Sequence, residues 1–459
     1  MMFKQMFKRK PIGLLLTLSA FALHAPAGAA SNPEESPLRF SGFGTLGAVH
    51  NQGDGAAFIR DITQPKGATN RGISFDLDSR VGVQANYPIS DSVEAVAQIV
   101  SRYRQENDYR PELTWGFLKY TFNDMLEMRA GRIGFDAYIG ADSRDVGYSY
   151  LWVRPPVEYY GTLLFPYEDG GDIVLRGPVL SGVGRAKFYT GITRQQAGSL
   201  LEQREWAGNM TVDPIGSTQD MNKSRVTGGF VEYQDNHWIG RLGVAELKLA
   251  RGFPPGKINM MGVFQASADQ AYAQNNLALG NALTSFIDEI QVLNRKTVFK
   301  SIELAYEDGP LKVQGAVARI TSTSLLIPKS RSAFVSAGYR FGRLTPYATA
   351  SFLRTRTYSR PEELASLGAP SYVVSMTQFL LSTPITNQDT YAFGLRYELA
   401  NKAAVKFQAD FVHNKNCSPV SLPVVGPGTP CAPPLLWPTV PPSWDGRANI
   451  YSAVLDFTF

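Results

Sequence analysis

Residues 449–459 read N-I-Y-S-A-V-L-D-F-T-F and have the alternating pattern of a β-strand. Side chains alternate along an extended chain, and one side of this stretch carries Tyr451, Ala453, Leu455, Phe457 and Phe459. No residue follows Phe459 in the sequence, so we expect the apolar side to be covered from outside the chain. A strand of about ten residues matches a bilayer, and lipid tolerates a strand only where a closed barrel pairs both of its edges. The stretch therefore predicts a membrane β-barrel, with an edge strand of a soluble β-sandwich as the alternative.

The first 30 residues have the pattern of a secretory signal peptide. Four basic residues precede an apolar run over residues 12–23, and small residues follow as far as Ala30. The run is too short for a membrane helix, and no later stretch reaches the ~18 apolar residues that a span needs. We therefore predict an exported chain, with residues 1–30 removed and residues 31–459 forming a single barrel domain.

The net charge gives no support for binding to nucleic acid. The signal contains four of the 45 Lys and Arg residues, so its removal leaves 41 of them against 40 Asp and Glu. A nearly neutral chain lacks the basic excess that is typical of nucleic-acid-binding proteins.

Period-two patterns recur along the rest of the chain. The clearest runs from Ile73 to Tyr87, where apolar residues alternate with polar and charged ones. The pattern predicts an all-β, antiparallel barrel of about 16 strands, an even number as expected for a single-chain outer-membrane barrel. The predicted strands cover residues 38–50, 73–87, 93–104, 112–122, 125–133, 168–178, 183–193, 224–234, 238–249, 297–307, 310–321, 332–342, 344–357, 389–399, 402–413 and 447–459.

Short turns alternate with long connections between these strands. Asp308 and Gly309 form one such turn, whereas the longest connection covers the 45 residues 251–295. Short periplasmic turns and long extracellular loops are typical of outer-membrane barrels. Aromatic residues end the strands on the short-turn side and predict an aromatic girdle at one membrane interface. They are Tyr87, Phe122, Tyr233, Tyr306, Phe341, Tyr397 and Phe459.

The opening strand contains Phe40, Ser41, Gly42, Phe43 and Gly44. With the signal peptide, the sixteen strands and the terminal Phe, this chain resembles the Gram-negative outer-membrane porin superfamily over its whole mature length. The resemblance implies a cofactor-free channel in the bacterial outer membrane for passive diffusion of small hydrophilic solutes and ions, and a homotrimer. It also implies contacts with outer-membrane lipid and lipopolysaccharide, and recognition of the final strand by the barrel-assembly machinery.

In porins the third loop folds into the barrel and narrows it, so the resemblance assigns this role to residues 134–168. Trp152, Pro155 and Pro156 suit a stiff, anchored loop. Charges of both signs would set a transverse field across the pore. The charged residues are Asp136, Asp142, Arg144, Asp145, Arg154 and Glu158. The alternative is a loop that lies over the outer mouth.

Three arginines on the polar sides of neighbouring predicted strands are candidates for the lumen wall. They are Arg80, Arg102 and Arg104, and they lie opposite Val81, Ile99 and Tyr103, which we expect to face lipid. Pairing of these arginines with local carboxylates is the alternative to a role in the ion path.

Two further features belong to the long connections. Cys417 and Cys431 lie in the last one, and the oxidising periplasm favours a disulfide between them. Leu279, Leu283 and Phe286 have helical spacing in residues 277–293. This helix packs inside its own loop, or it lids the pore or contacts lipopolysaccharide or another subunit.

An enzyme and an adhesive barrel are the competing function classes. Outside the signal the histidines are His50, His237 and His413, none of them in a G-x-S-x-G motif. His50 with Asp54 would be the acid/base pair of a surface hydrolase, but a lone His beside a polar loop is usually solvated, and we predict no catalytic residues. The sequence also contains no Cys or His cluster of the kind that binds metal.

Overall fold

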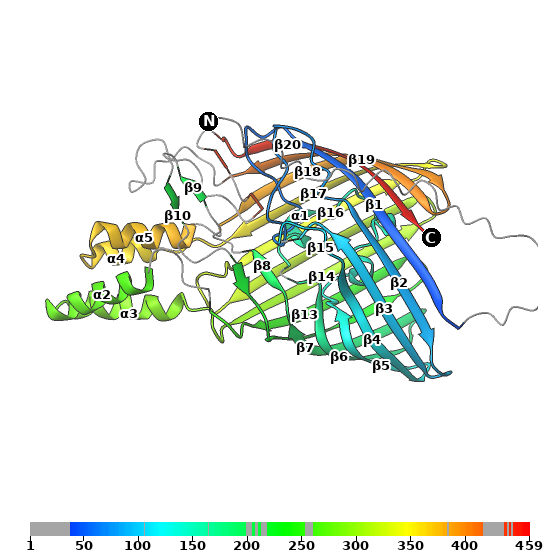
Figure 1. Ribbon diagram of the computed structural model, residues 1–459, viewed down its shortest axis with the longest axis horizontal. Helices are drawn as coiled ribbons and strands as arrows, with labels where there is room; N and C mark the ends of the chain where they lie inside the picture. Colours follow the sequence, from blue (N-terminus) through cyan, green and yellow to red (C-terminus); the bar gives the residue numbers. More distant parts are fainter. Residues whose placement is uncertain are drawn as a thin grey trace, which may run out of the picture. The chain divides into compact units, whose positions relative to one another are not determined.

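The computed structural model describes residues 37–104, 106–163, 165–198, 204–206, 210–212, 218–252, 260–382, 385–415, 436–437, 440–441 and 444–459. Sixteen strands form one closed antiparallel barrel, as predicted (Figure 1). In barrel order the strands are β1 (Arg39–Asn51), β2 (Arg80–Pro88), β3 (Val93–Arg102), β4 (Glu112–Asn123), β5 (Leu126–Gly134), β6 (Tyr167–Val179), β7 (Gly182–Thr193), β12 (Ser224–Gln234), β13 (Trp238–Lys248), β14 (Lys296–Asp308), β15 (Leu311–Ser322), β16 (Ser330–Tyr339), β17 (Leu344–Thr355), β18 (Asn387–Ala400), β19 (Ala403–Asn414) and β20 (Arg447–Thr458).

The first and last strands close the barrel. Phe43 pairs with Thr458 and Asn51 with Ile450, so the ladder between β1 and β20 extends over nine residue pairs. Gly42 lies against the ring of Phe459, where an added Cβ would come within 2.1 Å of the ring. A side chain at this position would therefore push the terminal ring away from the seam.

Side chains alternate between lipid-accessible and inward positions along each strand. On β14, Ile302 is 58% exposed and Leu304 is 50% exposed, whereas the intervening Glu303 is buried. Aromatic residues on the short-turn side also lie on the outer surface, as expected for a girdle. Those at least 40% exposed are Tyr87, Phe122, Phe341, Tyr397 and Phe459.

Two details of the predicted β2 and β3 strands are wrong. The structure begins β2 at Arg80 rather than near Ile73, because the side chain of Ser79 bonds the backbone of Gly47 in place of a further ladder rung. Tyr103 does not face lipid: it lies in the loop after β3, only 7% exposed, with its hydroxyl donating to Asn107 at 2.6 Å.

The long connections contain the remaining elements. β8 (Gln196–Gly198) pairs with β11 (Thr218–Asp220), and β9 (Arg204–Trp206) pairs with β10 (Met210–Val212). The connection before β14 holds α2 (Met260–Ala273) and α3 (Leu277–Glu289), and the one before β18 holds α4 (Arg360–Ser366) and α5 (Ser371–Ser382). None of the helices in the described residues is long and apolar enough to cross a membrane.

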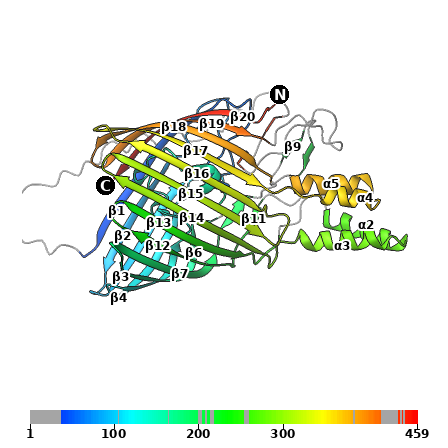
Figure 2. The same cartoon turned by 180° about the vertical axis from the view of Figure 1, so that it is seen from behind.

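The helix predicted within residues 277–293 is present as α3. It packs against α2 of its own loop, and these two helices contact α5 and α4 of the other loop. Figure 2 shows the four helices beyond the strand ends on the long-loop side. Leu283 and Phe286 are fully buried in this assembly, so the helix has a packing role within the loops.

Two predictions lie outside the described residues. They are the signal peptide at residues 1–30 and the disulfide between Cys417 and Cys431. Both stay predictions.

Candidate pore constriction

Residues 135–166 connect β5 to β6 and lie inside the barrel. The loop contains two short 3₁₀ turns, η1 (Ala141–Ser143) and η2 (Gly147–Ser149), and the single helical turn α1 (Val157–Tyr160). Gly140 precedes η1 with a φ of 79°, a left-handed conformation that favours glycine. The loop enters the lumen because its polar groups find partners on inward-facing residues around most of the wall.

Arg154 is the most deeply held of these groups, with 2% of its side chain exposed. Its guanidinium donates to Asp78 at 2.7 Å, to Asp410 on β19 at 2.9 Å and to Ser452 on β20 at 2.5 Å. Burial lowers the pKa of Arg154, but the two carboxylates outweigh burial and raise it, so the side chain stays charged. The same pairing lowers the pKa of Asp78 despite the opposing effect of burial.

Lys406 on β19 holds the loop backbone. Its ammonium group donates to the carbonyl oxygens of Gly147, Tyr150 and Trp152 at 2.7, 2.6 and 3.0 Å, and pairs with Asp456 at 2.9 Å. Three carbonyls on one ammonium fix the backbone path through η2 without using any loop side chain.

The helical turn α1 is held by the next part of the wall. The buried carboxylate of Glu158 accepts hydrogen bonds from Ser351 on β17 at 2.7 Å and from Gln388 on β18 at 2.6 Å, and also from Thr390. Trp152 donates its indole N–H to Ser336 on β16 at 2.7 Å.

The start of the loop is held by the opposite wall. Asp136 pairs with Lys187 on β7 and with Arg241 on β13, each at 2.8 Å. Burial raises the pKa of Asp136, but these two cations outweigh burial and lower it. The backbone N–H of Ile139 donates to Glu303 on β14 at 2.8 Å. The loop is therefore tied to opposite walls of the barrel, and it crosses the lumen between them.

Asp145 is surrounded by four arginines. Arg102 on β3 reaches its carboxylate at 3.2 Å, Arg80 on β2 donates to its backbone carbonyl at 2.7 Å, and Arg60 and Arg144 lie close enough to act on its charge. Burial raises the pKa of Asp145, but the four guanidinium groups together lower it.

A small charged cavity lies beside Asp145. It has a volume of about 70 Å³ and is lined by Arg60, Asp61, Arg102 and Arg144 together with tyrosines and prolines of the loops. A water molecule occupies about 30 Å³ of liquid volume, so this space holds roughly two waters. Three guanidinium groups and two carboxylates on its lining give the space a net positive character.

The structure brings together some of the predicted site residues and separates others. Arg80, Arg102, Arg144 and Asp145 form the cluster beside the cavity. Arg104 lies in the loop after β3, where it pairs with Asp108 at 3.2 Å. The remaining four lie elsewhere in the loop: Asp136, Arg154 and Glu158 are buried anchors, and Asp142 is exposed.

The partners that hold the loop from other strands and loops cannot be identified from the sequence pattern. Asp78, Lys406 and Asp410 are polar residues on inward positions, which the strand pattern marks as polar without naming a partner. Arg60 lies in a long loop where no periodic pattern marks it.

The histidines do not gather at this site. His50 on β1 and His413 on β19 lie at outward positions, and His237 lies in a short turn. The ring of His50 contacts the carbonyl oxygen of Gly72 at 3.1 Å. The absence of an enzymatic function stays a prediction.

Comparison with known proteins returned solved structures only. No protein-family model and no curated protein sequence matches the chain. The anion-selective porin from Comamonas acidovorans is 11% identical, with 92% of this chain and 99% of that chain covered and a TM-score of 0.49. OmpT of Vibrio cholerae is 10% identical over 94% of this chain and 99% of that chain, with a TM-score of 0.46. The channel DcaP of Acinetobacter baumannii is 9% identical over 95% and 100%, also with a TM-score of 0.46. Likenesses at these identities and TM-scores carry no conclusion about the function of this chain.

Proposed function

We propose that the protein is a channel of the bacterial outer membrane through which ions and small hydrophilic solutes diffuse, with residues 135–166 as its constriction. The observation that carries the proposal is a loop tied across a closed barrel by buried ion pairs on opposite walls, with a charged, water-sized cavity beside it. The exposed apolar positions and aromatic girdle of the outer surface suit a bilayer.

The charges beside the loop favour anions over cations. Arg60, Arg102 and Arg144 line the cavity with Asp61 and Asp145, and Arg80 lies directly behind Asp145. Rings of arginine in a narrow pore favour anions, because the guanidinium groups cannot lose their charge at accessible pH. The small volume favours ions and compact solutes over large ones.

Conductance in a planar bilayer tests the proposal. The purified protein is reconstituted between solutions of unequal salt concentration, and the reversal potential is measured for wild type, Arg102→Gln and Arg102→Glu. Each change removes positive charge beside the cavity, so the reversal potential should shift stepwise toward cations. Arg343→Glu is the matched control, because this arginine is exposed in the short turn between β16 and β17. A wild type without conductance rules out the channel, and equal reversal potentials in all variants remove Arg102 from the ion path.

Further parts of the proposal rest on the sequence alone. They are export through residues 1–30, recognition of the β20 strand by the barrel-assembly machinery, contact with lipopolysaccharide, a Cys417–Cys431 disulfide and a homotrimer. The pairing of β20 with both β1 and β19 is compatible with its role as the closing strand. Native mass spectrometry of the detergent-solubilised protein measures the subunit number directly.

A further inference from the structure

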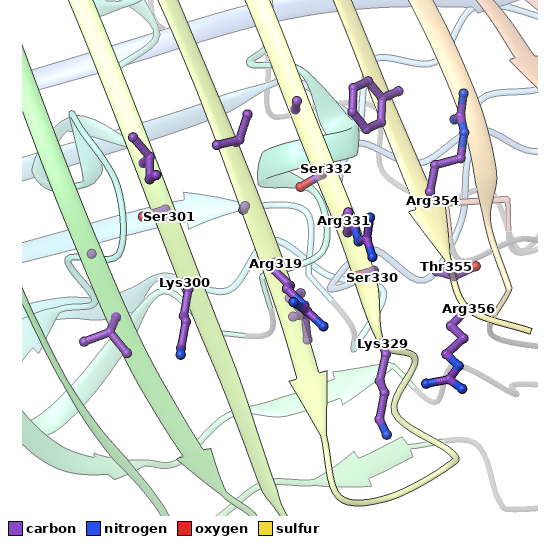
Figure 3. A pocket seen from close by; sticks show the side chains of 18 residues that line it. Lys300, Ser301, Arg319, Lys329, Ser330, Arg331, Ser332, Arg354, Thr355 and Arg356 are labelled. Carbon is purple, nitrogen blue, oxygen red and sulfur yellow. The ribbon is translucent and has the colours of Figure 1, made fainter.

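Four basic residues form a row across neighbouring strands on the outside of the barrel. Lys300 on β14 pairs in register with Arg319 on β15, Arg319 with Arg331 on β16, and Arg331 with Arg354 on β17. Directly opposite residues on antiparallel strands are about 5 Å apart, so the row extends over about 15 Å. Figure 3 shows these four side chains with Lys329 and Arg356 on their long-loop side. We call these six residues the basic row.

The four strand residues of the row lie on the lipid-accessible side of the wall. Ile302, Val317 and Phe352 lie two residues nearer the short turns on their strands and are 58%, 50% and 40% exposed. Toward the long loops the wall carries Lys329 and Arg356 instead. The row therefore marks the boundary where the apolar outer surface ends. A groove of about 1060 Å³ runs along this boundary, lined by the basic row and by these apolar residues.

The positive charge of the row is largely unbalanced. Arg354 pairs with Asp389 on β18. Within the part of the chain that the structure describes, the side chains of the other five residues make no ion pair or hydrogen bond. Like charges directly opposite one another on neighbouring strands are destabilising. An anion outside the chain that lies along the row would relieve this repulsion.

We propose that the basic row binds the phosphate groups of a lipopolysaccharide in the leaflet on the long-loop side. This inference rests on the proposed outer-membrane location. The ligand must be amphiphilic, because the groove offers cations on one side and exposed apolar side chains on the other. A single phosphate group is much shorter than the row, so a headgroup with more than one phosphate fits it better. Lysine and arginine bind phosphate through charge-assisted hydrogen bonds, and arginine does so with two parallel N–H groups.

The test measures lipid retained by the detergent-solubilised full-length barrel, by native mass spectrometry. The probes are bis-phosphorylated lipid A, its monophosphorylated form and its fully dephosphorylated form, each with and without an excess of sodium phosphate. The test variant is Arg319→Ser with Arg331→Ser. The matched control is Arg340→Ser with Arg343→Ser, which removes two exposed arginines from the opposite end of the same wall.

The wild type should retain the bis-phosphorylated lipid most strongly and the dephosphorylated lipid least. Each Lys or Arg near a membrane surface contributes about a fivefold gain in binding to anionic lipid, so the test variant should bind about 10- to 30-fold more weakly. The control should bind as the wild type does. A second variant, Arg319→Glu, places an anion between Lys300 and Arg331. It should lose lipid binding and unfold at a higher temperature in lipid-free detergent, because it replaces repulsion with attraction.

Four results overturn the proposal. They are unchanged binding in the test variant, an equal loss in the control, equal retention of the dephosphorylated lipid, and displacement of lipid A by sodium phosphate, which would indicate a site for free anions. The proposed channel function and the proposed lipid site can be refuted independently. A barrel that retains lipid through its phosphates without conducting refutes the channel alone, and a conducting barrel with unchanged lipid binding in the test variant refutes the site alone.

Discussion

Replacing Arg154 with Met should release the loop 135–166 from one wall of the barrel. Met is apolar and long enough to fill part of the space, so the change removes the charge more than the volume. Asp78 and Asp410 then lie buried without their shared cation, and Ser452 loses its donor. The start of the loop keeps its own anchor, since Asp136 still pairs with the opposite wall.

Breaking a buried ion pair by removing one partner typically costs about 3–5 kcal/mol. If the loop carries this cost, its docked state becomes less populated relative to the released state by a factor of about one hundred to several thousand. The barrel ladder is untouched, because Arg154 belongs to no strand. We therefore expect the variant to fold as a barrel with a wider and more variable lumen.

Single-channel recording in a planar bilayer measures this effect. Arg154→Met should show higher mean conductance and frequent transitions between levels, where the wild type shows one stable level. Arg176→Met is the matched control, because Arg176 also pairs with a carboxylate, Glu127 at 3.0 Å, but its side chain is 42% exposed. Exposed pairs contribute only about 0–1 kcal/mol, so this control should conduct as the wild type does.

A compensating variant checks the physical reason. Adding Asp78→Asn and Asp410→Asn to Arg154→Met removes the two buried carboxylates that lost Arg154, of which Asp78 still has Arg60 at 4.0 Å, and should restore much of the thermal stability without restoring the wild-type conductance. Wild-type conductance and noise in a correctly folded Arg154→Met variant would show that the position of the loop does not depend on this anchor. A triple variant as unstable as the single one would show that charge burial is not the source of the cost.

Two further predictions concern the same loop, and a third concerns the last long connection. Deleting residues 140–152 should raise single-channel conductance and weaken solute discrimination in bilayer recordings, and unchanged conductance in a folded deletion variant would remove the constriction role. The difference in ion selectivity between the wild type and Asp145→Asn should stay constant from about pH 8 to about pH 4, because the lowered pKa of Asp145 keeps its carboxylate ionised over that range, and the difference should disappear only at lower pH as protonation removes the charge; a difference that disappears near neutral pH would contradict this assignment. Nonreducing peptide mass spectrometry should find Cys417 linked to Cys431, whereas quantitative thiol labelling without reductant would disprove the bridge.

The strand pattern predicted the barrel because period two is a local property. The observed ends of β14 are each within one residue of the predicted ends. The prediction succeeds because successive side chains of this strand face the outside and the inside of the barrel alternately over its whole length. The same reasoning failed between Ile73 and Ser79. In this segment Asp78 pairs with Arg154 of another loop, and it lies close to Gly47, which has no side chain in the way. These tertiary contacts end the β-ladder at a point where the alternating sequence pattern still continues.

The candidate site was predictable as a segment but not as a set of contacts. Arg154 is 76 residues from Asp78 and 256 residues from Asp410, and only the closed barrel brings the three together. The basic row shows the same limit. Arg319 and Arg331 are each visible as a charge at an outward position, but their alignment depends on strand register, which follows from turn lengths and pairing rather than from either strand alone.

The anchors of the loop also have a consequence for the order of assembly. The strands that hold the far side of the loop come later in the sequence than the loop itself. The partners of Arg154 include residues on β19 and β20, and those of Glu158 are on β17 and β18. Contacts between residues so far apart in sequence form late in folding. Closing a long chain segment costs conformational entropy before the contacts that stabilise the closed state are made. The proposed constriction therefore takes shape only as the last strands join the sheet, and we expect a barrel inserted before that step to leak more than the finished one.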